Sequence, residues 1–502
     1  MKNMLSTCAV MVLLGAVSAQ GQSAVTEYKG LDGNVNQTID GHGAWLDNSG
    51  SWIYTPSSSI EQLWMRNGTD TTLSGMTLGT SGWLKMGESL LPVPPAGTTK
   101  LHVIGSNAFV NVSLSSKNQG LRIGQDYSAH LYVEGGTVTV ANGTEGKPIH
   151  VGIDGRYGNP NAEARLFITG GYVNAKAKVN IGSWGSLNGK IDISGGVLQT
   201  PLIQVGNCSN DDYAPGTGTG VLAVSGTGLV QVGGAGIELG TGYGSGTNYN
   251  TNGTLEQTGG SVRLTGTSNC DLKIGNWGTG LYSLTGGVLD MMYLSTDIIV
   301  GGGVSGRFKV GQGGKVVSQG TYQSFANATL ELLIGSSANF DMSFLSIYAA
   351  TSTFDGDLAM TLTGGYTPTY GQEWKVMSFA GPLTGAFDSV TTDWEYSIRN
   401  EGGLKNLYVK YMKSAVSHPG DANGDNLVNV GDLGILAGNW GGSGKTWAEG
   451  DFTGDGLVNV SDLGVLSGNW GWAGGSMQPV PEPATLGLLA LGAIGLVRRR
   501  RS

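Results

Sequence analysis

The sequence predicts a mainly β protein built as a β-solenoid, followed by a small α-helical module and a C-terminal hydrophobic helix. Three observations support this prediction: a glycine-rich repeat over residues 116–340, a pair of acidic loops within residues 413–475, and an apolar segment beside a basic C-terminus. Glycine accounts for 88 of the 502 residues, well above its usual share of about 7%. Hydrophobic residues make up 39% of the chain, which is enough to form a core.

Two alternating marks define the repeat, and both recur about every 30 residues, as the units of stacked repeats do. The first mark is an apolar residue followed by glycine, and the second is a glycine pair or a close variant of one. The first occurs at Ile123-Gly124, Val151-Gly152, Ile181-Gly182, Val205-Gly206, Leu239-Gly240, Ile274-Gly275, Val300-Gly301 and Ile334-Gly335. The second occurs at Gly135-Gly136, Gly170-Gly171, Gly195-Gly196, Gly226-Thr227-Gly228, Gly259-Gly260, Gly286-Gly287 and Gly313-Gly314.

Each repeat offers only short strands with one apolar face, so it is too small to bury a core alone. Glycines can supply tight corners, and coils stacked about 4.8 Å apart pair their backbone groups and form a continuous core. We therefore predict a solenoid, with a right-handed parallel β-helix as the favoured form and a glycine-rich β-sandwich as the alternative. The Asn-Gly pairs at 67, 142 and 252 are expected in its turns.

The segments on either side of the repeat are predicted to close it. Residues 20–115 are expected to form an N-terminal β cap that merges into the first coils. Residues 341–412 are expected to form a C-terminal β cap, because 358–362 and 407–411 alternate in polarity and an uncovered last coil would be an open sheet edge. These glycine-rich strand repeats with a closing segment resemble the autotransporter-associated β-strand repeats.

Two twelve-residue loops, at 421–432 and 451–462, have the spacing of a calcium-binding loop. Such a loop supplies oxygen ligands from positions 1, 3, 5, 9 and 12 and a backbone carbonyl from position 7, a donor set that suits a hard cation such as Ca²⁺. Position 12 is aspartate in both loops, where an EF-hand has glutamate. The expected ligands are Asp421, Asn423, Asp425, Leu427, Asn429 and Asp432 in the first loop, and Asp451, Thr453, Asp455, Leu457, Asn459 and Asp462 in the second.

A short apolar segment after each loop predicts one helix, and both units end in Gly-Asn-Trp, at Trp440 and Trp470. Paired loops that each lead into one helix resemble a type I dockerin. The resemblance implies calcium-dependent folding of residues 413–475 and a cohesin-like module as one candidate partner. The positions that meet a cohesin in that family are Val430-Gly431 and Val460-Ser461 in this chain, and no lysine or arginine follows them on the expected helices.

The C-terminus combines a short motif, an apolar segment and a run of arginines. Pro481, Glu482 and Pro483 precede the apolar residues 484–497, which would span about 21 Å as a helix, short of a hydrocarbon core of about 30 Å. The basic residues Arg498, Arg499, Arg500 and Arg501 would hold this end on the cytoplasmic side.

Residues 476–502 therefore resemble the PEP-CTERM signal of Gram-negative bacteria, with a transmembrane segment. The resemblance implies an exosortase-type membrane protease as partner, at least transient anchoring in the inner membrane, and a final place on the outer surface or in the extracellular matrix. A plain C-terminal anchor is the alternative.

The N-terminus agrees with export. Lys2 gives a positive start, residues 4–17 are mostly apolar, and small residues end at Ala19, before Gln20. This pattern predicts a signal peptide over residues 1–19. The formal net charge of −9 argues against nucleic acid as a partner.

No sequence pattern indicates a catalytic centre clearly. Asp126 and Asp154 fall in one column of neighbouring coils, but the acidic column does not continue. The histidines are expected at the surface or in turns, and Cys208 and Cys270 are expected to stay unpaired because a coil separates them. We therefore interpret the chain as a non-enzymatic exported protein. The alternatives are a glycoside hydrolase or polysaccharide lyase of the β-helix type, and a carbohydrate-binding protein that uses Trp184 and Trp277 to bind exopolysaccharide. The histidines are His42, His102, His130, His150 and His418.

Overall fold

A computed structural model of the chain contains two compact units. The first unit consists mainly of strands and extends to residue 409. The second unit comprises residues from 410 onward together with two short segments, 367–373 and 393–395. The described residues are 36–39, 60–65, 70–74, 77–87, 98–112, 120–124, 127–141, 148–153, 162–183, 188–207, 218–242, 251–267, 269–292, 296–345, 350–412, 418–425, 427–473 and 476–477.

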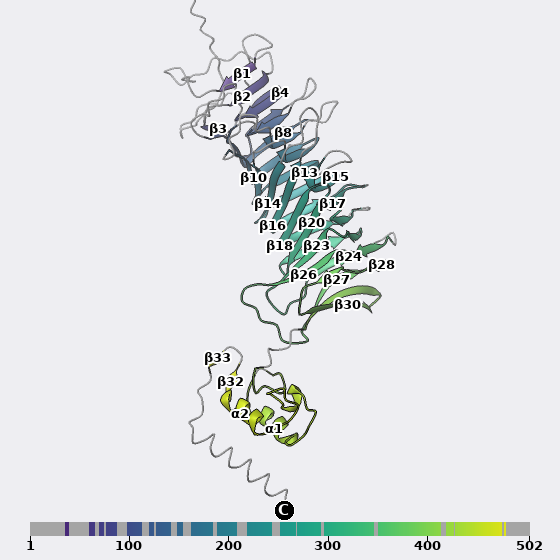
Figure 1. Cartoon of the computed structure of the whole chain (residues 1–502). Coiled ribbons are helices and arrows are strands. Elements are labelled where there is room, and N and C mark those ends of the chain that lie inside the picture. Colours follow the sequence, from purple (N-terminus) through teal and green to yellow (C-terminus); the bar gives the residue numbers. More distant parts are fainter. Residues whose placement is uncertain are drawn as a thin grey trace, which may run out of the picture. The chain divides into compact units, whose positions relative to one another are not determined.

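In the first unit each coil contributes three strand segments, and equivalent segments of successive coils pair side by side (Figure 1). The described pairings from β1 to β29 are parallel, so the unit is a solenoid-like stack and the β-sandwich alternative is wrong. Three sheets, named I, II and III here, follow from the pairing. Several long strands bend at a glycine and serve two sheets in turn.

Sheet I consists of β3 (Asp70–Ser74), β5 (Thr99–Ile104), β8 (Ala129–Val140), β10 (Glu163–Ala175), β12 (Asn188–Ile193), β14 (Gly218–Val224), β16 (Thr251–Leu264), β18 (Thr279–Met291), β20 (Ser305–Gly311), β23 (Ala328–Ile334), β26 (Asp357–Leu362) and β29 (Ser389–Val390). Sheet II takes the later parts of β8, β10, β16 and β18 and adds β4 (Thr77–Met86), β6 (Phe109–Val112), β13 (Val197–Asn207), β15 (Leu229–Thr241), β21 (Gly314–Ser318), β24 (Asp341–Phe344), β27 (Glu373–Phe379) and β31 (Leu404–Tyr411).

Sheet III takes the later parts of β4, β13 and β15 and adds β1 (Asn36–Ile39), β2 (Ile60–Met65), β7 (Leu121–Ile123), β9 (Ile149–Ile153), β11 (Val179–Ser183), β17 (Asp271–Ile274), β19 (Ile298–Val300), β22 (Tyr322–Ser324), β25 (Ser352–Phe354) and β28 (Leu383–Gly385). β30 (Trp394–Glu401) precedes β31 along the chain. Because the coils continue in parallel from β24 to β29, the segment expected as a C-terminal cap contains further coil-forming strands.

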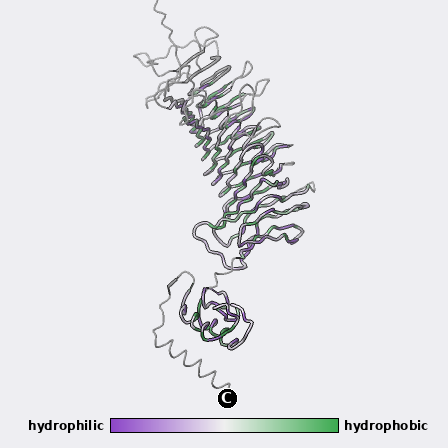
Figure 2. Tube along the Cα trace, in the orientation of Figure 1, coloured by the Kyte–Doolittle hydropathy of each residue, from purple (hydrophilic) through white to green (hydrophobic). Residues whose placement is uncertain are grey.

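The core of the stack comes from the period-two alternation of its strands, visible as alternating hydropathy in Figure 2. In sheet I, Leu131, Leu166, Ile191 and Leu222 lie in register on successive coils, and each is fully buried. Burial of one such side chain stabilises the fold by about 1.5–3 kcal/mol. Each coil therefore adds one layer to a core that runs along the stack.

Glycine makes the corners possible. All the predicted apolar–glycine marks except Gly335 place their glycine at positive φ. At Gly182, with φ of +66°, a Cβ atom would lie 1.8 Å from the carbonyl oxygen of Thr219 on the neighbouring coil. Both the backbone conformation and the close approach therefore require glycine there. By contrast, Asn252-Gly253 lies inside β16 and pairs with β14 and β18, so its expected place in a turn is wrong.

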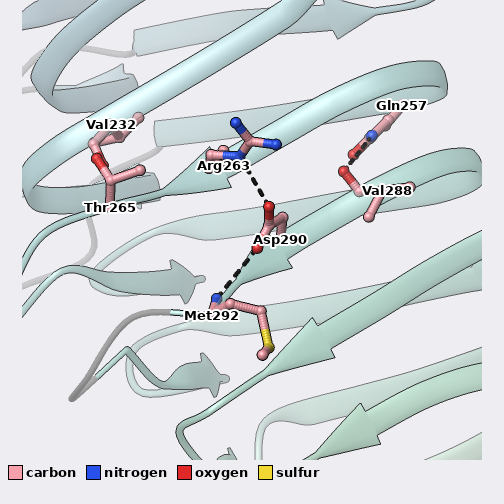
Figure 3. A network of polar contacts seen from close by, with 7 residues as sticks. All are labelled: Val232, Gln257, Arg263, Thr265, Val288, Asp290 and Met292. Carbon is pink, nitrogen blue, oxygen red and sulfur yellow. Dashed lines mark hydrogen bonds and ion pairs between the residues drawn. The ribbon is translucent and has the colours of Figure 1, made fainter.

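Polar side chains also pair from coil to coil, as Figure 3 shows for β16 and β18. The outward Arg263 Nε lies 2.8 Å from Asp290 Oδ2 of the next coil. Inside the stack, the buried Gln257 donates from Nε2 to the Val288 carbonyl at 3.0 Å (Figure 3). Its side-chain carbonyl accepts from the Tyr282 hydroxyl at 2.5 Å. Burial raises the pKa of Tyr282, so its hydroxyl stays a donor.

Three of the histidines expected at the surface or in turns lie in strands. His102 and His130 are partly exposed and so remain at the surface, whereas His150 is buried and the expectation is wrong for it. His102 stacks on Tyr132 at 4.3 Å and continues an aromatic ladder across β5, β8 and β10. His130 lies in β8, and His150 lies in β9 with only 5% of its surface exposed. Desolvation by burial, followed by the Arg122 and Lys178 charges, lowers the pKa of His150 well below its usual value. His42 lies outside the described residues.

The second unit contains α1 (Val430–Gly438), the 3₁₀ turn η1 (Trp447–Glu449), α2 (Val460–Gly468), and the short strands β32 (Trp472–Ala473) and β33 (Ser476–Met477). No helix among the described residues combines the length and apolar character needed to cross a bilayer. The apolar segment 484–497 lies outside those residues.

Candidate metal centre

The second unit is internally two-fold, and the symmetry follows the 30-residue offset between its loops. Val428 of the first loop bonds to the segment after α2, with its carbonyl accepting from Gly471 at 2.9 Å. Val458 of the second loop bonds in the same way to the segment after α1, with its carbonyl accepting from Gly441 at 2.8 Å. Each loop is therefore held by the far end of the other repeat. The six buried core residues also occupy equivalent positions in the two repeats, 30 residues apart: Ala422 and Phe452, Val428 and Val458, and Leu436 and Leu466.

Both helices begin at the loops through capping boxes. Asn429 caps α1 by accepting from the Gly431 N–H, while Asp432 accepts from the Asn429 N–H. Asn459 and Asp462 repeat this arrangement at α2. The expected ligands at positions 9 and 12 therefore also fix the start of each helix, which couples loop geometry to helix formation.

In the first loop the structure brings three of the expected ligands together. One carboxylate oxygen from each of Asp421, Asp425 and Asp432 lies within 4.8 Å of the others. Asn423, at position 3, lies beside them, because its Nδ2 donates to Asp425 Oδ2 at 2.9 Å. In the described part of the chain, this is the one group of at least three histidine, cysteine, aspartate or glutamate side chains positioned to hold a metal ion.

The second loop has the same layout with different contacts at position 3. The Thr453 hydroxyl lies 3.0 Å from Asp462 Oδ1 and 3.4 Å from Asp451 Oδ1. Asp451 also accepts from the N–H groups of Gly454 and Gly456, each at 2.8 Å. Asp455 Oδ1 accepts from the Leu457 N–H at 2.8 Å.

Leu427 and Leu457 occupy position 7 of the two loops, and they are 42% and 46% exposed. Their side chains therefore add little to the core, and their backbone carbonyls are the groups expected to bind the cation. Sequence reasoning missed Gly420 and Gly450, which enter the loops at φ near +100°. A Cβ at Gly450 would lie 2.8 Å from Leu436 Cα, and one at Gly420 would lie 3.0 Å from Leu466 Cα. Their 30-residue spacing was the signal that could have found them.

Buried negative charge is the main electrostatic feature of this unit. Asp421, Asp432, Asp451 and Asp462 are each at most 3% exposed. Desolvation raises the pKa of Asp462, but hydrogen bonds from Asn459, Thr453 and Phe452 outweigh it, and the net pKa is lowered. Within the described residues no lysine or arginine pairs with Asp432, Asp451 or Asp462.

This donor set fits a hard divalent cation. Buried carboxylates are normally paired with a cation or bound to a metal, because an isolated buried charge is strongly unfavourable. Six aspartates, supported by amide and hydroxyl oxygens, supply the all-oxygen environment that Ca²⁺ prefers. Sulfur and imidazole, which transition metals favour, are absent from both twelve-residue loops.

The predicted sorting residues lie outside the described part of the chain. These are Ala19, Pro481, Glu482, Pro483, Arg498, Arg499, Arg500 and Arg501. Residues 479–501 match the PEP-CTERM protein-sorting motif. No curated protein and no solved structure matches the chain. The motif indicates an exported protein of a Gram-negative bacterium that an exosortase, a membrane protease, recognises and sorts to the cell envelope.

Proposed function

We propose that this chain is a non-enzymatic protein of the outer surface or extracellular matrix, in which a right-handed parallel β-helix carries a calcium-dependent, dockerin-like module. The sorting motif at 479–501 supports export. In this proposal a signal peptide ends at Ala19, and the exosortase processes the chain near Pro481-Glu482-Pro483. The parallel coil stack supports a scaffolding role, because it presents long regular faces.

The calcium assignment depends on one observation. Asp432, Asp451 and Asp462 are buried, accept from backbone N–H groups, and have no basic partner among the described residues. Calcium would supply the missing positive charge to both loops. The dockerin likeness is supported by the single helix after each loop and by the crossed backbone bonds of Val428 and Val458.

A cohesin-like module is the candidate partner of this unit. Val430 and Val460 are 72% and 71% exposed and begin the two helices, at the positions that face a cohesin in dockerins. They offer two equivalent apolar contacts related by the internal two-fold. Pull-down with a panel of cohesins, compared with a Val430→Asp and Val460→Asp double variant, tests this assignment.

Hydrogen exchange followed by mass spectrometry tests the calcium assignment on the full-length chain. Chelation with EDTA should remove protection from peptides covering 421–473, because the small core cannot hold the loops against buried charge repulsion. Peptides from β8 to β23 should keep their protection and serve as the internal control. Unchanged exchange in 421–473 after chelation would refute calcium-dependent folding.

Carbohydrate binding is a second candidate, favoured by exposed apolar side chains that follow neighbouring strands of sheet III. Trp277, Val304 and Phe325 follow β17, β19 and β22, which pair in register, and they are 45%, 48% and 45% exposed. Exposed aromatic side chains of this kind can pack against sugar rings of an exopolysaccharide. Glycan-array binding that falls in Trp277→Ala, but not in the exposed control Tyr370→Ala, would support this role.

A polysaccharide-degrading activity stays the alternative. Asp126 and Asp154, the acidic pair noted in the sequence, lie outside the described residues, as does Trp184. A degradation panel over neutral and acidic polysaccharides separates an enzyme from a binding or scaffold protein. Release of shortened sugars would overturn the non-enzymatic proposal.

A further inference from the structure

We infer that the two calcium loops are not equivalent: the first is the tighter site, and Thr453 is the residue that weakens the second. This inference rests on the calcium binding proposed above. The two calcium sites would fill in a fixed order, and one side chain would set that order. The proposed difference arises at position 3. Position 6 also differs, with Asn426 in the first loop and Gly456 in the second, but neither residue is an expected ligand.

The two loops share nearly all of their ligand chemistry. Each offers aspartate at positions 1, 5 and 12 and asparagine at position 9, so their formal charges are equal. Net charge therefore cannot separate their affinities. Among the expected ligand side chains, only position 3 differs in chemistry, with Asn423 in the first loop and Thr453 in the second.

The first loop is already arranged for a cation. Asp421, Asp425 and Asp432 bring one oxygen each within 4.8 Å, and the equivalent trio of the second loop does not form such a group. Asn423 reaches Asp425 through both ends of its amide, with Oδ1 accepting from the Asp425 N–H at 3.0 Å and Nδ2 donating to Asp425 Oδ2 at 2.9 Å. For Asn423 to coordinate an ion, its Nδ2 must release Asp425 Oδ2 and its carbonyl oxygen must turn toward the ion, a change within one side chain of the loop.

The second loop is held together by the Thr453 hydroxyl instead. That hydroxyl lies between Asp451 and Asp462, the two buried carboxylates that an ion must join. To coordinate calcium, the hydroxyl must turn its hydrogen away and give up the bond to Asp462 at 3.0 Å. Its oxygen is also nearer the backbone than an asparagine carbonyl oxygen, so the loop must contract to reach the ion.

Both loops give up a hydrogen bond at position 3, so the difference comes from the carboxylates of the second loop, which are not yet grouped, and from the shorter reach of the Thr453 hydroxyl. We expect this difference to amount to a factor of about ten in affinity. The second site should therefore bind calcium about tenfold more weakly than the first. Occupancy should rise in the first loop, which fixes α1, before it rises in the second, which fixes α2.

Isothermal titration of the full-length chain with calcium tests the order of filling. We expect two events that differ about tenfold in dissociation constant. Asp421→Ala should remove the tighter event, and Asp451→Ala the weaker one. Hydrogen exchange at stepped calcium concentrations provides an independent readout, because peptides over 421–432 should gain protection at lower calcium than peptides over 451–462.

A reciprocal swap tests the role of Thr453. Thr453→Asn should tighten the second event about tenfold and leave the first unchanged, while Asn423→Thr should weaken the first toward the second. Equal affinities in the unmodified chain, earlier filling of the second loop, or a Thr453→Asn variant with unchanged affinities would overturn the inference while leaving calcium binding in place. Absence of any calcium binding would instead remove the proposed function itself.

Discussion

The coil stack and the loop module contrast in what holds them folded. Successive coils of the stack add fully buried side chains such as Leu131, Leu166 and Ile191 to a continuous core. The module has a buried core of only six residues and places four aspartates at or below 3% exposure beside it. Repetition therefore makes the stack tolerant of local loss, whereas the module depends on whatever balances its buried charge.

The largest expected effect comes from removing one aspartate from each loop. Asp421→Ala with Asp451→Ala should unfold the module as chelation does, because both sites lose their first ligand. Hydrogen exchange of the full-length chain should show lost protection over 421–473 and none lost from β8 to β23. Glu256→Ala, an exposed carboxylate of the stack, is the matched control. A double variant that retains protection would show that the module does not depend on metal.

Substitution of Gly182, at a corner of the coil stack, should destabilise the stack for steric reasons rather than through charge. Gly182→Val combines a positive φ with an approach of 1.8 Å to the Thr219 carbonyl oxygen, so it should destabilise the stack by about 3–5 kcal/mol. Gly302→Ala is the control, since its φ is not positive and its nearest neighbour would lie 3.9 Å away. Chemical denaturation followed by circular dichroism measures the difference. Similar midpoints for the two variants would contradict the role assigned to the corner.

The contrast also explains what could be predicted from sequence. Gly182 and its counterparts were predictable because a coil corner requires glycine whatever surrounds it. Asp421, Asp425 and Asp432 were predicted as a group from their ligand spacing, but the same spacing does not bring Asp451, Asp455 and Asp462 as close together. The burial of Asp421 and Asp432 and the hydroxyl contacts of Thr453 were not predictable, since all of them depend on how the repeats pack.

Errors arose where tertiary pairing overrode a local signal. Asn252-Gly253 has the composition of a turn, but parallel neighbours on both sides hold it within β16. His150 looked like a surface residue, but both faces of β9 are buried in the folded chain. The continuation of coils through β24 to β29 was missed, although Gly364-Gly365 shortly after β26 repeats the glycine-pair mark of earlier coils.

His150 gives the stack an acid sensitivity that its apolar core would not produce. Its folded pKa lies below its usual value of 6.5, because burial and then the Arg122 and Lys178 charges disfavour the protonated form. Stability should therefore be flat above about pH 6.5 and fall by about 1.4 kcal/mol per pH unit below it, until the folded pKa is reached. Denaturation of the stack at several pH values should show this slope, and His150→Gln should reduce it. An equal slope in the variant would assign the acid loss to other groups.

The smallest expected effect concerns an outward-facing ion pair between neighbouring coils. Arg263 and Asp290 lie 2.8 Å apart on neighbouring coils, but their side chains are 42% and 23% exposed, so solvent screens most of their attraction. A double-mutant cycle with Arg263→Ala and Asp290→Ala should give a coupling energy below about 1 kcal/mol, and it should shrink at high salt. A coupling of several kcal/mol would mean that outward charge pairs, rather than the inward apolar layers, hold successive coils together. The stack would then resemble the module in depending on charge balance, and the contrast between the two units would fail.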